Sequence, residues 1–258
     1  MNLLTLPENI KATTVSQPIF LKGTSEEAIL LIHGFTGIPL DMAYVAHQLN
    51  AAGFTVSVPR LPGHGTSSED FLRSTWRDWL RKVIDTYLDL SGIYKKVYVA
   101  GLSMGGLLTL ILASIFHPPK IATIAGAIII NDWRIKLTPI LSVFLKQLPK
   151  KQPQQKYDNP ELEYLSKEYW SYNWPPQGKQ LYKLMKIARK NLKKVSSDIL
   201  ILASENDKTV PLKAAHYIYH NVSSEKRKII VFKKSGHVMT NDIEKEKVAL
   251  ELIKWFKN

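Results

Sequence analysis

Ser103 has the sequence surroundings of a catalytic serine nucleophile. It lies in Gly101-Leu102-Ser103-Met104-Gly105, between an apolar run at 97–100 and another at 107–112. This G-x-S-x-G pattern, at a strand-to-helix turn, holds a serine hydroxyl on a corner so tight that glycine is favoured on both sides. The N-terminus of the following helix favours an oxyanion at the same point. Because the bare motif also occurs in ordinary turns, the partners of Ser103 decide the interpretation.

A serine hydroxyl needs a base to take its proton and a carboxylate to hold that base. Asp207 follows the apolar run 199–203, and His237 follows the run 228–232, so both are predicted at strand ends. The chain order serine, acid, histidine is that of the α/β-hydrolase type. Taken singly, Asp207 could cap a helix, Glu205 could be the acid, and His237 could be a surface histidine.

A third strand-end loop is a candidate for holding the oxyanion. The apolar run 28–32 reads as a strand covered on both faces, and it ends at His33-Gly34-Phe35. Hydrolases of the α/β type place a loop here whose backbone N–H contacts the oxyanion, which makes Phe35 the candidate donor. For His33 we favour a satisfied core histidine over a catalytic residue.

Strand and helix patterns alternate along the chain, which predicts a mostly parallel central sheet with helices on both faces. Asp41 is expected to cap the first helix, Ser74 or Thr75 the second, and an early antiparallel strand is expected within 15–23. The other strands are predicted at 28–32, 54–58, 97–100, 121–130, 199–203 and 228–232. The final helix is predicted at 242–256, with Ile243 facing inward.

The pattern changes between residues 131 and 195, where no buried strand is evident. We interpret residues 131–195 as an inserted helical cap, and residues 1–130 together with 196–258 as the α/β-hydrolase core. Within the cap, helices are predicted at 135–148, 160–170 and 179–192. The first of these has an apolar stripe that is expected to face the core or the roof of an acyl pocket. The last combines an apolar face with many lysines, so it either packs on the core, which we favour, or lies on anionic lipid.

Composition narrows the classes of function. A length of 258 residues with 45% hydrophobic content suits one domain with an insertion. The absence of cysteine excludes disulfides, a cysteine nucleophile and thiolate ligands, and we expect no metal or cofactor. The net charge is +13, but no nucleic-acid-binding motif accompanies it, so we expect no nucleic-acid partner and at most weak membrane-surface contact through the basic cap.

The sequence carries fewer signals of the protein's cellular location and oligomeric state. No apolar run is long enough to span a bilayer, and residues 1–8 lack the features of a signal peptide, so a cytoplasmic location is expected. The oligomeric state is unknown, because no local pattern fixes it.

Five segments together resemble the serine carboxylesterases of the α/β-hydrolase superfamily, in particular the bacterial monoacylglycerol lipase and carboxylesterase branch. They are HGFTG at 33–37, PRLPGHGT at 59–66, GLSMGG at 101–106, DKTVP at 207–211 and SGHV at 235–238. The resemblance covers nearly the whole chain and is weakest in the cap. It implies that Ser103 is the nucleophile, His237 the base and Asp207 the acid. It also implies an oxyanion hole formed by the N–H groups of Phe35 and Met104, and a lid over a hydrophobic acyl tunnel.

Relatives selective for monoacylglycerol have a cap segment resembling Tyr157-Asp158-Asn159-Pro160, with a nearby glutamate that binds glycerol hydroxyls. Here Glu161, Glu163 and Glu168 compete for that role. The prediction is therefore a serine esterase for short to medium acyl esters, monoacylglycerols among the candidates, working through an acyl-serine intermediate. Two alternatives remain: a thioesterase with the same triad, whose basic cap would attract a phosphorylated carrier, and a hydrolase-fold binding protein without activity.

Overall fold

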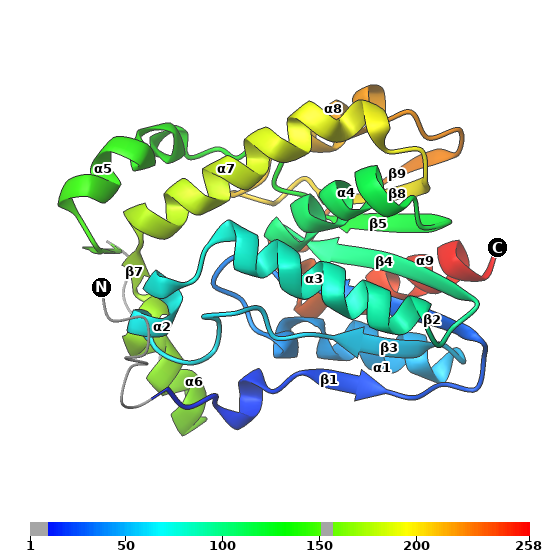
Figure 1. Ribbon diagram of the computed structural model, residues 1–258, viewed down its shortest axis with the longest axis horizontal. Coiled ribbons are helices and arrows are strands. Elements are labelled where there is room, and N and C mark those ends of the chain that lie inside the picture. Colours follow the sequence, from blue (N-terminus) through cyan, green and yellow to red (C-terminus); the bar gives the residue numbers. More distant parts are fainter. Residues whose placement is uncertain (1–9, 151–156) are drawn as a thin grey trace.

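A seven-stranded sheet runs through the computed structural model, which describes residues 10–150 and 157–258 (Figure 1). Residues 1–8, on which the signal-peptide prediction depends, lie outside this part of the chain. The strand order is β1-β3-β2-β4-β5-β8-β9, and every neighbouring pair is parallel except β1 with β3. The strands are β1 (Ile19–Leu21), β2 (Glu27–Ile32), β3 (Thr55–Val58), β4 (Lys96–Leu102), β5 (Lys120–Ile124), β8 (Asp198–Ser204) and β9 (Arg227–Phe232).

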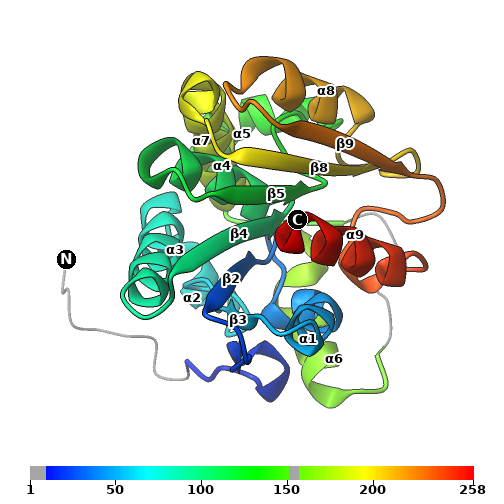
Figure 2. The ribbon, with the colours of Figure 1, turned by 90° about the vertical axis from the view of Figure 1, so that its right-hand side faces the viewer.

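Helices cover both faces of the sheet (Figure 2). One face packs against α1 (Ala43–Ala51) and α9 (Lys245–Lys257), and the other against α3 (Trp76–Ser91), α4 (Met104–Phe116), α7 (Pro175–Asn191) and α8 (Leu212–Asn221). Residues 28–32 of β2 are all apolar because both faces of the strand are buried. Ile29 and Leu31 pack on the side of α1 and α9, and Leu30 and Ile32 pack on the side of α3 and α4. The predicted α/β architecture is therefore confirmed.

The apolar run after α4, residues 121–130, was predicted to form one strand. The predicted strand is too long. Strand β5 ends at Ile124, because Ala125 adopts a φ of 46° and turns the chain away from the sheet. Residues 125–128 stay buried as a loop, and the N–H of Ala127 donates to the carbonyl of Ser103 at 3.2 Å. The apolar run therefore supports the turn that carries Ser103.

Two helix starts also differ from the prediction. Asp41 lies in a 3-10 turn (Pro39–Met42), where its carboxylate accepts from the N–H of Ile38, and α1 begins only at Ala43. Ile243 precedes α9 and is exposed, whereas the helix itself buries Val248 and Leu252 as expected. The expected N-cap before α3 is confirmed at Thr75. A short helix, α2 (Ser68–Arg73), precedes it and had no predicted counterpart.

The segment that we propose as the cap, residues 131–195, lies between β5 and β8 in the chain. Besides α7, it contains α5 (Thr138–Phe144), β6 (Leu148–Pro149), α6 (Pro160–Leu165), a π-helical turn (Ser166–Trp170) and β7 (Tyr172–Asn173). The prediction of one helix over 135–148 is wrong. A 3-10 turn (Trp133–Leu137) is followed by the short helix α5, which ends at Phe144. Its apolar stripe is largely exposed, with Ile140 at 65% and Phe144 at 79%.

Helix α7 packs as favoured from its sequence. Its apolar face is buried, and this face together with the turn that follows comprises Leu181, Leu184, Met185, Ala188, Leu192 and Val195. Lys183, Lys186 and Lys190 of α7 are exposed, and Lys179 is half-buried. None of the helices within residues 10–150 and 157–258 combines the length and the apolar character needed to cross a membrane.

Candidate active site

The turn between β4 and α4 holds Ser103 in a strained backbone conformation. Ser103 has φ 56° and ψ −111°, in the region that non-glycine residues rarely adopt. The flanking glycines are required by close packing: a Cβ on Gly101 would collide with the backbone of Gly105, and a Cβ on Gly105 would collide with the carbonyl of Ile32. Hydrogen bonds fix the backbone on both sides of Ser103. The N–H of Ser103 donates to the carbonyl of Ile124, and the carbonyl of Ser103 accepts from the N–H of Gly106.

The three residues singled out from the sequence meet at one point. The Oγ of Ser103 lies 2.9 Å from Nε2 of His237, and Nδ1 of His237 lies 2.7 Å from Oδ2 of Asp207. The other carboxylate oxygen of Asp207 accepts from the N–H groups of Thr209 and Val210, at 2.8 and 2.9 Å. Asp207 is buried, whereas the side chain of His237 is 23% exposed. The competing acid, Glu205, is exposed.

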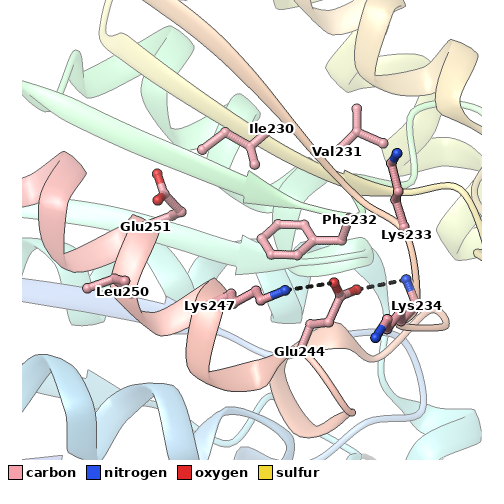
Figure 3. Close-up of a pocket in the computed structure, with 9 residues that line it drawn as sticks. All are labelled: Ile230, Val231, Phe232, Lys233, Lys234, Glu244, Lys247, Leu250 and Glu251. Carbon is pink, nitrogen blue, oxygen red and sulfur yellow. Dashed lines mark hydrogen bonds and ion pairs between the residues drawn. The ribbon is translucent and has the colours of Figure 1, made fainter.

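The loop that carries His237 is held by two carboxylates that sequence reasoning missed. Oε2 of Glu244, a buried residue, accepts from the N–H groups of Lys234 and Ser235, each at 2.9 Å. Figure 3 shows Glu244 between the Lys234 backbone and the Lys247 side chain, in a groove between β9 and α9. Asp242 accepts from the N–H of Gly236 at 2.6 Å. A lone glutamate before a helix carries no sequence signal for this role.

Replacing Glu244 with alanine is expected to lower kcat about 10- to 100-fold with little change in KM for a small ester, because the His237 loop loses its anchor. Stopped-flow or steady-state kinetics with p-nitrophenyl acetate measure this effect. Glu244→Gln should recover most of the rate, since its amide oxygen can still accept. Lys247→Ala, which removes only the 3.7 Å ion pair with Glu244, is the matched control and should retain the rate. An unchanged kcat in the alanine variant would contradict the anchoring role.

The loop after β2 brings backbone N–H groups to the same place. Gly34 abuts the nucleophile, since a Cβ on Gly34 would lie 3.4 Å from Cβ of Ser103. Within the described part of the chain, no hydrogen bond occupies the N–H of Phe35. Met104 is the first residue of α4, so its N–H has no intrahelical acceptor. The N–H groups of Phe35 and Met104 are therefore available to donate to an oxyanion. Their role as the oxyanion hole is part of the proposal below.

His33 is a core residue with both ring nitrogens paired. Its Nε2 accepts from the N–H of Leu61 at 3.1 Å, which assigns the proton to Nδ1, 3.0 Å from the carbonyl of Gly34. Burial lowers the pKa of His33 to about 4, and burial also lowers the pKa of the neighbouring His64 well below its usual value. The interpretation of His33 as a satisfied core histidine is confirmed.

These two histidines predict a loss of stability in mild acid. In the unfolded chain they take up protons below pH 6.5, whereas the folded His33 stays neutral down to about 4. The free energy of unfolding should therefore fall as the pH drops from 7 to 5, by about 2 kcal/mol from His33 alone. His64 adds to this loss, and Asp41, whose folded pKa is raised to about 6, offsets part of it. Urea unfolding at the two pH values measures this, with His216→Gln, at an exposed histidine, as the control. Equal free energies at both pH values would contradict the assignment.

A pocket of about 220 Å³ opens beside Ser103 and His237. Trp170 from the cap segment contributes to its wall, and its indole N–H donates to the carbonyl of Thr36 at 2.7 Å. Asp41 also lines the pocket, and burial raises the pKa of its carboxyl to about 6. Tyr157, from the segment that resembles monoacylglycerol-selective relatives, lies on the same wall.

The three competing glutamates separate in space. Glu161 accepts from Thr14 and Val15, and Glu168 accepts from the N–H of Ser68, so both tie the cap segment to the core. Glu163 instead accepts from the N–H of Tyr157 at 3.2 Å, and it is the one bonded to a residue that lines the Ser103 pocket.

Comparisons with known proteins identify the family of this chain. Residues 29–249 match the Alpha/beta hydrolase family, and the chain belongs to that family. It is a hydrolase of the branch that includes bacterial lipases and carboxylesterases.

Two curated relatives match along most of their length. The thermostable monoacylglycerol lipase of Bacillus sp. (strain H-257) is 34% identical over 234 residues, covering 88% of this chain and 89% of the relative. The carboxylesterase of Bacillus subtilis (strain 168) is 26% identical over 244 residues, covering 93% and 96%. A solved structure from work on LipS and LipT, two metagenome-derived lipolytic enzymes, has a TM-score of 0.83 at 28% identity, covering 95% of this chain and 99% of that one.

Proposed function

We propose that the protein hydrolyses short to medium acyl esters of carboxylic acids, with monoacylglycerols among its substrates, using Ser103, His237 and Asp207. The observation that carries this proposal is the unbroken chain of hydrogen bonds from Ser103 through His237 to Asp207 at the mouth of a pocket. Family membership and the similarity to lipases and carboxylesterases support it.

In the proposed reaction, Nε2 of His237 takes the hydroxyl proton of Ser103 while Oγ attacks the ester carbonyl carbon. The carbonyl oxygen becomes an oxyanion, which the N–H groups of Phe35 and Met104 stabilise. Collapse of this intermediate breaks the bond to the alcohol oxygen, which receives the proton from His237 and leaves. Water, deprotonated by His237, then attacks the acyl-serine in the same way, and the acid is released. Asp207 stabilises the imidazolium throughout.

The acyl and alcohol preferences are tested with matched substrates. The 220 Å³ pocket favours acetyl to octanoyl esters over palmitoyl esters, and the carboxyl group of Asp41 in its lining favours an alcohol with free hydroxyls, such as glycerol. We expect kcat/KM to be highest for butyryl or octanoyl groups, and higher for 1-octanoylglycerol than for ethyl octanoate. Equal values for the two alcohols would remove glycerol recognition from the proposal and leave ester hydrolysis intact.

The thioesterase alternative uses the same triad on a different leaving group. Octanoyl-CoA and 1-octanoylglycerol, compared side by side, separate the two, and a higher kcat/KM for octanoyl-CoA would favour the thioesterase. A hydrolase-fold protein without activity would give no burst and no turnover with p-nitrophenyl acetate.

We also propose a cytoplasmic location with weak contact to anionic membrane surfaces through the cap. Because α7 buries its apolar face, its lysines can contribute only charge. The exposed apolar side chains lie instead on α5, where Val143 is 72% and Phe144 79% exposed. Apolar side chains beside basic ones are typical of segments that lie on anionic lipid.

Sedimentation with vesicles tests the membrane contact. We expect the protein to pellet with phosphatidylglycerol vesicles at low salt, and to be released at high salt because the charges are screened. A triple variant, Lys183→Gln, Lys186→Gln and Lys190→Gln, should bind less at low salt, and Phe144→Ser should also bind less there, because it removes an exposed apolar contact. Vesicles of phosphatidylcholine are the control. The absence of pelleting at low salt would dismiss the contact.

A further inference from the structure

A second cleft, larger than the Ser103 pocket, lies on another part of the molecule. It has a volume of about 500 Å³, against about 220 Å³ beside Ser103, and the two share no lining residue. Its walls come from the chain that follows β5, at 129–136, and from helices α7 and α8. None of the triad residues borders it, so the proposed hydrolysis leaves this cleft unexplained.

Part of the lining of this cleft is apolar. Met185 and Tyr182 of α7 contribute from one side and Tyr217 of α8 from the other, while Ile130 and Ile135 complete the surface. Met185 is almost fully buried and the two tyrosines are half-buried, so the tyrosines present most of the apolar surface that the helices expose here. A hydrocarbon chain is the ligand part that such a surface accepts.

Three cationic side chains border the same cleft: Lys136, Arg189 and Lys213. The Nε of Arg189 donates to the carbonyl of Ile128 at 2.9 Å, which holds its guanidinium in place. Among the described residues, neither Lys136 nor Lys213 has an acidic partner, and both are exposed. Uncompensated lysines beside an apolar wall favour a ligand with a negative head group.

Asp132 is the one acidic residue among the described residues that line the cleft, and it is already paired. Asp132 pairs with Arg134 at 2.7 Å, and the hydrogen bonds from Arg134 lower the pKa of the Asp132 carboxyl. Asp132 therefore leaves the positive potential of Lys136 and Lys213 largely intact. The cleft thus combines an apolar wall, a positive rim and an internally paired acid.

We propose that this cleft binds a medium-chain fatty carboxylate, with the carboxylate between Lys136 and Lys213 and the hydrocarbon chain along Met185, Tyr182 and Tyr217. The choice of a fatty acid rests on the proposed function, because ester hydrolysis releases this acid. The cleft would retain the product after it leaves Ser103. The geometry of the cleft itself does not depend on catalysis.

Equilibrium binding of decanoate to the Ser103→Ala variant tests the proposal without turnover. Isothermal titration calorimetry should show saturable binding of decanoate at one site per chain. This binding should persist when a non-reactive ester analogue blocks the Ser103 pocket. Decanol, which lacks the charge, should bind at least about tenfold more weakly. Trp133, which lines the cleft, gives a fluorescence change that Trp133→Phe should remove.

Charge removal supplies the decisive comparison. In the Ser103→Ala background, Lys136→Ala with Lys213→Ala should weaken decanoate binding at least about tenfold, the loss typical of removing a charged partner. Lys183→Ala with Lys190→Ala, at exposed positions of α7 that do not line the cleft, should bind as before. Circular dichroism shows whether each variant is folded.

Three results would overturn the proposal. The first is no saturable binding of decanoate, and the second is equal binding of decanoate and decanol. The third is binding that is unchanged in the Lys136→Ala, Lys213→Ala variant and is lost when the Ser103 pocket is blocked. An inactive wild-type protein would contradict the proposed hydrolysis alone, since the binding experiment uses no turnover. The two failures are therefore distinguishable.

Discussion

Ser103→Ala is expected to lower kcat for p-nitrophenyl butyrate by about 10⁴- to 10⁶-fold, because no other hydroxyl lies within reach of His237 Nε2 in the described site. The residual rate would come from the oxyanion N–H groups and from substrate binding. The variant should fold normally, since alanine is no larger than serine at this buried turn. Steady-state kinetics and a thermal melt measure both properties.

The control for this variant is Ser91→Ala, at an exposed serine at the end of α3, which should retain full activity. A Ser103→Ala protein that is folded and keeps more than about a hundredth of the wild-type kcat would remove Ser103 from the mechanism.

Asp207→Asn is expected to lower kcat by about 10⁴-fold while leaving the fold intact. An asparagine oxygen can still accept from Thr209 and Val210, so the loop keeps its two backbone contacts. Its amide N–H₂ would instead face Nδ1 of His237. That contact favours the tautomer protonated at Nε2, which cannot accept the proton of Ser103. The rate over pH 6 to 9, compared with wild type, measures the effect.

Glu205→Gln is the matched control, because Glu205 was the competing acid in the sequence and is exposed in the structure. It should retain wild-type kcat. A large loss in Glu205→Gln together with a small loss in Asp207→Asn would reverse the assignment of the acid.

The site could be predicted from sequence because its residues lie at strand ends. Ser103, Asp207 and His237 each follow an apolar run, and carboxyl ends of parallel strands meet at one edge of a sheet. Periodicity also predicted the buried face of α7, because that face packs on the core along its whole length. Their catalytic roles stay a proposal until the variants are measured.

The features that the sequence did not indicate depend on tertiary contacts. Glu244 anchors the His237 loop through two backbone N–H groups, and no local pattern distinguishes it from a surface glutamate. The apolar run after β5 was predicted as strand throughout, but a positive φ at Ala125 turns it into a buried loop. The stripe on α5 has helical spacing like a core helix, yet Ile140 and Phe144 are exposed, because spacing alone does not say what covers a face.

The central claim is that one serine hydroxyl is the nucleophile, and covalent labelling followed by mass spectrometry tests it most directly. A fluorophosphonate should add a single adduct to the intact protein, and peptide mapping should place it on Ser103. Labelling should be slowed in Asp207→Asn and absent in Ser103→Ala. An adduct on a different residue, or no adduct on a folded and active enzyme, would contradict the account.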